Sequence, residues 1–79
     1  MKLLNKSEAL LVMLAADEQV KNTPTYRMGQ AIYNLICGEL FSHEEIIAVE
    51  DHYKWYNSTD AVWCTEYFIE HFVEGGVLL

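Results

Sequence analysis

The chain has 79 residues, of which 52% are hydrophobic and 13% aromatic, with a single proline and four glycines. This length holds one domain and excludes a second core, and the aromatic content excludes a disordered chain. The net charge of −7 arises from residues 39–79, which carry nine acids and one lysine, and such a negative surface excludes ordinary binding of DNA or RNA. We therefore expect one packed domain over residues 1–79 whose C-terminal half attracts a basic surface.

The first predicted helix runs from Ser7, a favourable N-cap residue, to about Glu18. Residues 10–14 read Leu-Leu-Val-Met-Leu, so this helix is apolar nearly all round. A helix of that kind is typical of a protein interior, and we expect it to be the central, buried element of the fold. The break that follows contains Pro24, which disfavours helix in the residue before it.

The second predicted helix begins after Thr25, which we expect to cap it, and ends at Gly38. Gly29 lies in its first turn, where two interpretations stay open. Either fraying reduces the cost of a glycine there, or the missing side chain lets a neighbouring helix approach closely. The apolar residues of this segment recur at the spacing of one helical face, namely Met28, Ile32, Leu35 and Ile36.

The third predicted helix has the clearest start signal in the chain. Ser42 and Glu45 have the spacing of a capping box, and Phe41 and Ile46 have the spacing of a hydrophobic staple across the same helix start. Both signals indicate that a helix begins here.

This third helix is predicted to continue through Glu50 and Lys54, a favourable i,i+4 pair, to a turn over residues 56–60. A fourth helix then runs from about Asp60 to Val73 and is ended by two glycines. For the apolar tail over 77–79 three alternatives stay open: it packs back on the domain, it joins an interface, or it frays. The sequence thus predicts an all-α fold, a small bundle of three to four short helices.

Acidic residues form a row on the fourth predicted helix. Glu66, Glu70 and Glu74 recur every four residues and so follow one line of a helix surface. The row is either a solvated face that keeps the protein in solution or a stripe that docks on a basic groove. If that groove normally holds nucleic acid, the stripe imitates a phosphate backbone. Glu50 and Asp51 are assigned to the same partner-binding set.

Aromatic residues are concentrated over 52–56, and four more rings follow by residue 72. Most of these rings are expected to staple the third helix to the fourth. Tryptophan and tyrosine also dominate binding hot spots. Because Trp55 and Tyr56 lie at a helix end beside a turn, we expect them to be apolar anchors for a partner.

Catalysis and metal binding find no support in the spacing of the chemically active residues. The chain has no glycine-rich phosphate loop and no nucleophile elbow. Five residues are candidate metal ligands, but their spacings fit no zinc pattern: His43, His52, His71, Cys37 and Cys64. We expect no enzyme, no metal and no cofactor. The apolar run over 9–16 is too short to span a membrane, and we expect a cytoplasmic protein with free, buried cysteines.

Three short stretches carry a resemblance to a known group of proteins. Residues 27–35 read Arg-Met-Gly-Gln-Ala-Ile-Tyr-Asn-Leu, residues 55–58 read Trp-Tyr-Asn-Ser, and residues 67–72 read Tyr-Phe-Ile-Glu-His-Phe. In this pattern the chain resembles a loose group of very small phage-encoded proteins of unassigned function. That group's Gly-Thr-Asp stretch and its proline before the turn are absent, and Val-Glu-Asp-His-Tyr stands there at 49–53. The resemblance implies a viral or mobile-element origin and a role like that of host-takeover or anti-CRISPR factors. It carries over no catalytic residue.

The leading hypothesis is a non-enzymatic, phage-encoded protein that inhibits a host protein with a basic surface, in the cytoplasm of the bacterial host. Inhibition by steric occlusion and inhibition by nucleic-acid mimicry both stay open. Seven residues are predicted to contact the partner: Glu50, Asp51, Trp55, Tyr56, Glu66, Glu70 and Glu74. The alternative is a structural or regulatory subunit that buries its apolar surplus in a homodimer, because the first helix and the tail over 77–79 are so apolar.

Overall fold

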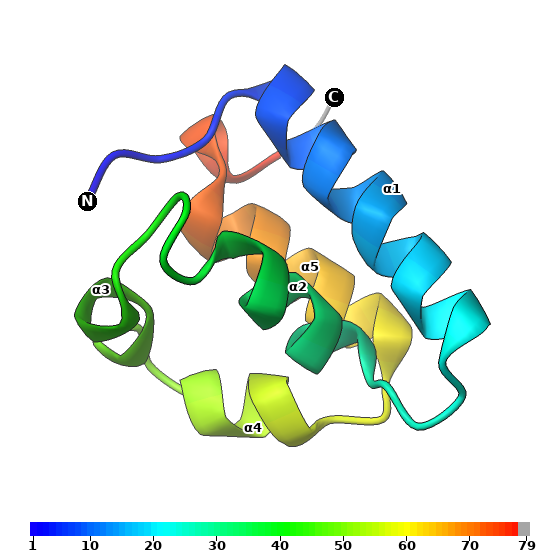
Figure 1. Cartoon of the computed structure of the whole chain (residues 1–79). Coiled ribbons are helices and arrows are strands. Elements are labelled where there is room, and N and C mark those ends of the chain that lie inside the picture. Colours follow the sequence, from blue (N-terminus) through cyan, green and yellow to red (C-terminus); the bar gives the residue numbers. More distant parts are fainter. Residues whose placement is uncertain (78–79) are drawn as a thin grey trace.

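Five α-helices and one 3-10 turn follow one another in the computed structural model, which describes residues 1–77 (Figure 1). Their bounds are α1 Lys6–Asn22, α2 Met28–Ile36, α3 His43–Ile47, α4 His52–Asn57, α5 Ala61–Phe72 and η1 Glu74–Gly76. The described part of the chain has no β-strand, only isolated bridges that pair Leu4 with Val73 and Cys37 with Phe41. The predicted all-α fold is confirmed, with five helices in place of three to four. No helix within residues 1–77 combines the length and the apolar character that a membrane span needs.

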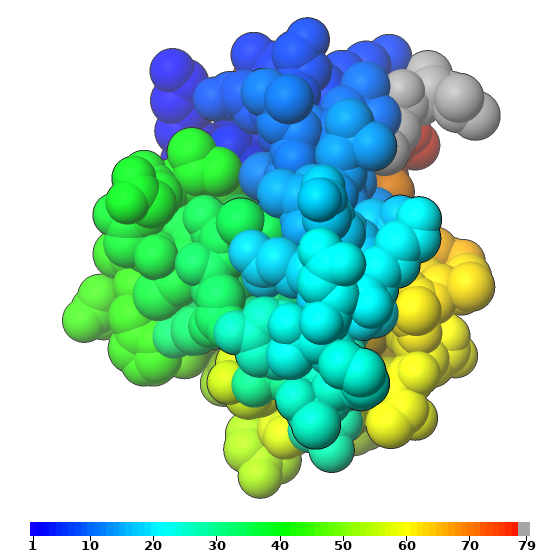
Figure 2. Space-filling view, turned by 45° about the vertical axis from the view of Figure 1, so that its right-hand side comes forward, coloured from blue at the N-terminus to red at the C-terminus, as the bar shows by residue number. Residues whose placement is uncertain are grey.

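The central helix is α2, which contacts α1, α4 and α5 (Figure 1). The prediction that the first helix is central and buried is therefore wrong. Helix α1 buries its small side chains, Ala9 and Ala16 among them, and leaves its leucines in solvent. Figure 2 shows α1, in blue to cyan, running across the surface of the molecule. Small side chains let two helix backbones approach closely, and the large residues then fall on the opposite side of α1.

Helix α1 is capped two residues earlier than the sequence suggested. The Asn5 side chain accepts a hydrogen bond from the Glu8 backbone N–H (2.9 Å), and the Glu8 carboxylate accepts one from the Asn5 N–H (3.0 Å). This reciprocal pair is a capping box built on asparagine, so the N-cap is Asn5 and not Ser7, although the helix begins near the predicted place. The helix also continues past the predicted end at Glu18, and reaches Asn22. It stops there because Thr23 is extended, ahead of the proline.

The second helix begins with Arg27 as its N-cap, so the predicted cap Thr25 lies two residues outside it. Its end agrees with the prediction, because Gly38 has a left-handed backbone (φ 88°) just beyond the helix. Gly29 is buried, and a Cβ atom added there would lie 2.0 Å from the carbonyl oxygen of Trp55. Of the two interpretations of Gly29, the close approach of a neighbouring helix is confirmed.

The single third helix of the prediction is two short helices. The capping box at its start is confirmed, since the Ser42 hydroxyl accepts from the Glu45 N–H (3.1 Å) and the Glu45 carboxylate accepts from the Ser42 N–H (2.9 Å). Helix α3 then ends at Ile47, and Asp51 takes a left-handed backbone (φ 61°) before α4 begins. The predicted i,i+4 pair of Glu50 with Lys54 is not formed, because the helix is interrupted between these two residues.

The aromatic core joins α4 to α5, as the sequence predicted for most of these rings. Trp55 is fully buried and stacks on Tyr67 (ring centroids 5.2 Å apart) and on Phe72 (5.7 Å). Its indole N–H donates to the Cys64 carbonyl oxygen at 3.0 Å. The two ends of the described chain are held together beside this core, since the Leu4 N–H donates to the Phe72 carbonyl at 2.9 Å.

Candidate binding surface

The predicted row of glutamates is interrupted at its last member. Glu66 and Glu70 are exposed one turn apart on α5, whose start at Asp60 agrees with the prediction. The helix ends at Phe72, however, because Val73 becomes extended (φ −115°, ψ 139°) and pairs with Leu4. Glu74 lies beyond this break, in η1. The prediction that all three glutamates follow one helical line is wrong for Glu74.

Two further acids lie beside α5 although they are distant in sequence. Glu50 and Asp51 are exposed in the turn between α3 and α4. The Tyr67 hydroxyl donates a hydrogen bond to the Glu50 carbonyl oxygen. Burial, together with the nearby negative charges of Asp51 and Glu50, raises the pKa of Tyr67 to about 12. The hydrogen bond places the turn against α5 at the level of Tyr67, which is buried, whereas Glu66 and Glu70 are exposed.

We call Glu50, Asp51, Glu66 and Glu70 the acidic surface. Within residues 1–77 no cation neutralises it, because the ion pairs there join other groups: the N-terminal ammonium with Glu45 at 3.7 Å, and Lys21 with Asp17 at 3.8 Å. Exposed carboxylates without a partner contribute their full charge to the surrounding potential. These four exposed carboxylates therefore keep their negative charge at the surface.

The two predicted aromatic anchors differ in exposure. Trp55 is completely buried in the core, so the prediction that its ring anchors a partner is wrong for the folded chain. Tyr56 is half-buried, and its ring meets Tyr33 edge-on with the ring centroids 5.3 Å apart. Tyr53 is the exposed ring of α4, with 74% of its surface in solvent. Trp55 faces inward and Tyr53 outward because helical residues two apart point to different sides.

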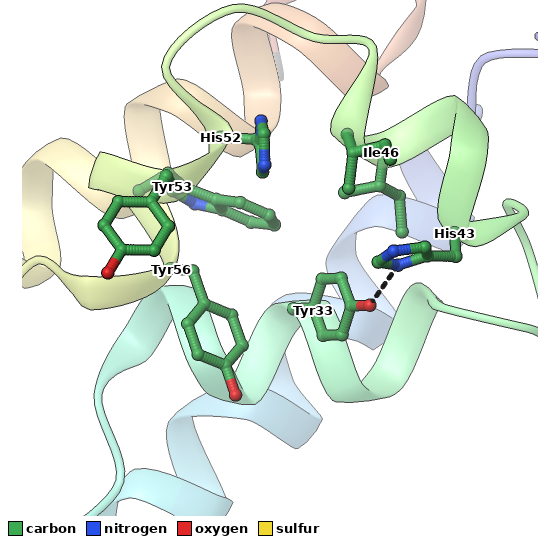
Figure 3. A pocket seen from close by; sticks show the side chains of 8 residues that line it. Tyr33, His43, Ile46, His52, Tyr53 and Tyr56 are labelled. Carbon is green, nitrogen blue, oxygen red and sulfur yellow. Dashed lines mark hydrogen bonds between the residues drawn. The ribbon is translucent and has the colours of Figure 1, made fainter.

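Between α2, α3 and α4 lies a pocket of about 240 Å³. Figure 3 shows side chains from the three helices gathered around one open space. We call this the aromatic pocket, and its lining is Tyr33, His43, Ile46, Ile47, His52, Tyr53, Trp55 and Tyr56. The Tyr33 hydroxyl and the His43 Nδ1 share a hydrogen bond of 2.7 Å across its wall. The pocket is thus a preformed, mainly apolar hollow with a few polar groups, which is the usual character of a ligand site.

The aromatic pocket and the acidic surface each include a residue at the start of α4. Asp51 belongs to the acidic surface, and the next residue, His52, lines the pocket. The sequence had predicted rings and acids in this segment, but it missed Tyr33, His43 and Tyr53 as lining residues. These come from three separate helices, and only the fold brings them together. The clustering of rings over 52–56 was the one signal in the sequence that pointed to this place.

The two cysteines of the chain differ in burial. Cys64 is fully buried and its thiol lies 3.4 Å from the Trp55 carbonyl oxygen, and burial raises the pKa of that thiol. A raised pKa keeps a cysteine in its unreactive thiol form. Cys37 is half-buried and also free. Among residues 1–77, no three His, Cys, Asp or Glu side chains are grouped closely enough to hold a metal ion.

Comparison of the chain with models of protein families, with curated proteins and with solved structures gives no match.

Proposed function

We propose that this chain is a non-enzymatic binding protein that docks on a basic surface of another protein. The observation that carries the proposal is the aromatic pocket, whose lining residue His52 directly follows Asp51, an exposed carboxylate that forms no ion pair within residues 1–77. The acidic surface attracts the partner, and the pocket takes one of its lysine or arginine side chains. The tyrosines of the pocket replace Trp55 as the anchoring residues.

The charge supports the first step of this proposal, the encounter. Residues 39–79 hold nine acids and one lysine, and four of these acids form the acidic surface. A negative patch accelerates diffusion toward a positive one and suppresses encounters with acidic surfaces. This interaction weakens as salt is added, because exposed charges are screened.

The pocket supports the second step, the anchoring of one side chain. A lysine ammonium or an arginine guanidinium binds favourably over the face of a tyrosine ring. Tyr33, Tyr53 and Tyr56 supply three such rings around the hollow (Figure 3). The volume of about 240 Å³ lies below the range of pockets for drug-sized ligands. This size therefore favours a single long side chain over a cofactor.

Inhibition of a bacterial host protein by a phage-encoded factor is the biological role we propose, in keeping with the resemblance of the sequence. Steric occlusion is the favoured mode. Mimicry of a phosphate backbone needs regularly spaced charges on one rod, and the interruption before Glu74 leaves only Glu66 and Glu70 on the helix.

Titration of the isotope-labelled protein with a tri-arginine peptide tests the proposal by NMR. We expect chemical shift changes at Tyr33, Tyr53 and Tyr56, and weaker binding at higher salt. Tyr53→Ala should weaken binding about tenfold, the size of effect that truncating an anchoring residue has. Combined Glu66→Gln and Glu70→Gln should weaken it less, because both charges lie outside the pocket.

Two controls accompany this titration. Glu18→Gln removes one negative charge from α1 and should leave the affinity for tri-arginine unchanged. A tri-glutamate peptide should cause no shift at the three tyrosines. Equal binding of tri-arginine by the Tyr53→Ala variant, or shifts at sites remote from the pocket, would contradict the proposal.

A further inference from the structure

An apolar face of α1 stands in solvent. Leu10, Leu11 and Leu14 are exposed over 51%, 69% and 68% of their surfaces. They lie on the side of α1 opposite to Ala9, Val12 and Ala16, which are its buried residues. We call these three exposed residues the leucine face. Clustered exposed leucines are unusual on a monomer and mark a surface that contacts another molecule.

The spacing along this side of α1 is that of a helix-pairing seam. Ser7, Leu11, Leu14, Glu18 and Lys21 alternate at intervals of four and three residues, and all are exposed. Intervals of four and three keep side chains on one side of a helix, as at the contact positions of a coiled coil. Leucines occupy the middle of the seam and polar residues its two ends. Such a seam fits a partner that is itself a helix of similar length.

The charges at the two ends of α1 are opposite in sign. Lys2, Lys6 and Glu8 give its beginning a net charge of +1 (two lysines against one glutamate), and Asp17, Glu18 and Lys21 give its end a net charge of −1 (two acids against one lysine). Lys21 also lies near the end, where it pairs with Asp17 at 3.8 Å, so Glu18 has no cationic partner on its own helix. A second α1 laid antiparallel brings the lysines of one copy beside the acids of the other. A parallel arrangement brings like charges together.

We propose that the leucine face binds a second copy of this chain, through antiparallel pairing of two α1 helices. A two-fold axis near the middle of the helix places Leu11 of each copy opposite Leu14 of the other. The interface is then self-complementary, as two-fold symmetry requires. With 17 residues, α1 provides a contact of about 25 Å in length. This inference is independent of the aromatic pocket, which lies on α2, α3 and α4.

Sedimentation equilibrium on the whole chain tests the proposal. At about 100 μM, a concentration at which even modest self-association is populated, the wild-type chain should be a dimer. Combined Leu11→Glu and Leu14→Glu should give a monomer with an unchanged far-UV circular dichroism spectrum, since both positions are exposed. Val62→Glu makes the same kind of change on α5, where Val62 is 67% exposed, and should leave the dimer intact.

Exchange of charges tests the antiparallel orientation. Lys6→Glu alone and Glu18→Lys alone should each weaken the dimer about tenfold, because each places like charges across the interface twice. An equimolar mixture of the two variants should form a heterodimer tighter than either homodimer, since both ends are then complementary. A wild-type chain that is monomeric at 100 μM, or a dimer that survives the double leucine substitution, overturns the proposal. A mixture that shows no recovery overturns the orientation.

Discussion

Helices α1 and α5 are the two longest in the molecule, and they bury opposite kinds of side chain. Helix α1 buries small residues and leaves large leucines in solvent. Helix α5 buries Phe68 and Phe72 and leaves two glutamates in solvent. Hydrophobicity alone therefore does not decide which face of a helix is buried. The distance to the neighbouring helix decides it too, because a close neighbour leaves room only for small side chains.

The comparison also separates two kinds of surface. The exposed glutamates of α5 and the aromatic pocket between α2, α3 and α4 suit a basic partner. The α1 side is apolar at its centre, with opposite charges at its ends, and suits a second copy of itself. Substitutions in the residues beneath each surface test whether this difference between the two helices holds.

The largest effect is expected from Trp55→Ala. The indole ring is fully buried, stacked on two other rings and hydrogen-bonded through its N–H. Its removal leaves a cavity, and the free energy of unfolding should fall by about 4 kcal/mol. Urea denaturation followed by circular dichroism measures this change.

Leu11→Ala is the matched substitution on the α1 side. In a solution dilute enough for the chain to be monomeric, it should change the free energy of unfolding by less than about 0.5 kcal/mol, as exposed positions do. A loss as large as that of Trp55→Ala would show that the leucine face is part of the monomer core, and the contrast between the two helices would then fail.

Gly29→Ala should have the second-largest effect. A methyl group there meets the Trp55 carbonyl oxygen at 2.0 Å and the carbonyl carbon at 2.8 Å, and backbone atoms cannot move aside as a flexible side chain can. Helices α2 and α4 must separate, so the free energy of unfolding should fall by about 3 kcal/mol despite the better helix propensity of alanine. Thermal unfolding of the variant measures the loss.

Gln30→Ala provides the control for this substitution on the neighbouring residue of α2. Gln30 is only partly buried, and its replacement should change stability by less than about 0.5 kcal/mol. Equal stabilities of the Gly29→Ala and Gln30→Ala variants would contradict the close approach of the two helices.

Local signals allowed the sequence to predict the helices, while their ends and their packing depended on tertiary contacts. The capping box at Ser42 was predictable because both of its hydrogen bonds join residues three apart in the chain. The break at Asp51 was not, because the hydrogen bond from Tyr67 to the Glu50 carbonyl joins residues 17 apart. The exposure of Trp55 was predicted wrongly for the same reason, since its indole partner is on another helix.

The candidate site was predictable only in part, and the reason is the same. Glu66 and Glu70 follow from the period of one helix, so their common exposed face was predicted from sequence spacing. The aromatic pocket needs three helices in their final positions (Figure 3). The pattern of residues along the chain does not show how α2, α3 and α4 are placed relative to one another, and Tyr33 and His43 were therefore missed.

A smaller effect than those of Trp55→Ala and Gly29→Ala is expected from Tyr67→Phe, which probes the connection between the core and the acidic surface. At neutral pH the substitution removes the hydrogen bond to the Glu50 carbonyl and should lower the free energy of unfolding by about 1 kcal/mol. In the folded chain the pKa of Tyr67 is about 12, above its ordinary value of 10.0. The folded state therefore holds this proton more tightly than the unfolded state does.

It follows from this difference that the contribution of Tyr67 to stability is complete below pH 10 and declines as the pH rises toward 12. The pKa of Tyr33 is also raised to about 12, first by a hydrogen bond with the Cys37 side chain and then by burial, so Tyr33→Phe serves as the matched control from the pocket. Absorbance titration of the phenol groups should show a component near pH 12 that loses amplitude in each variant. If Tyr67→Phe leaves this component and the alkaline loss of stability unchanged, the Glu50–Asp51 turn does not lie against α5, and the acidic surface is not one continuous patch.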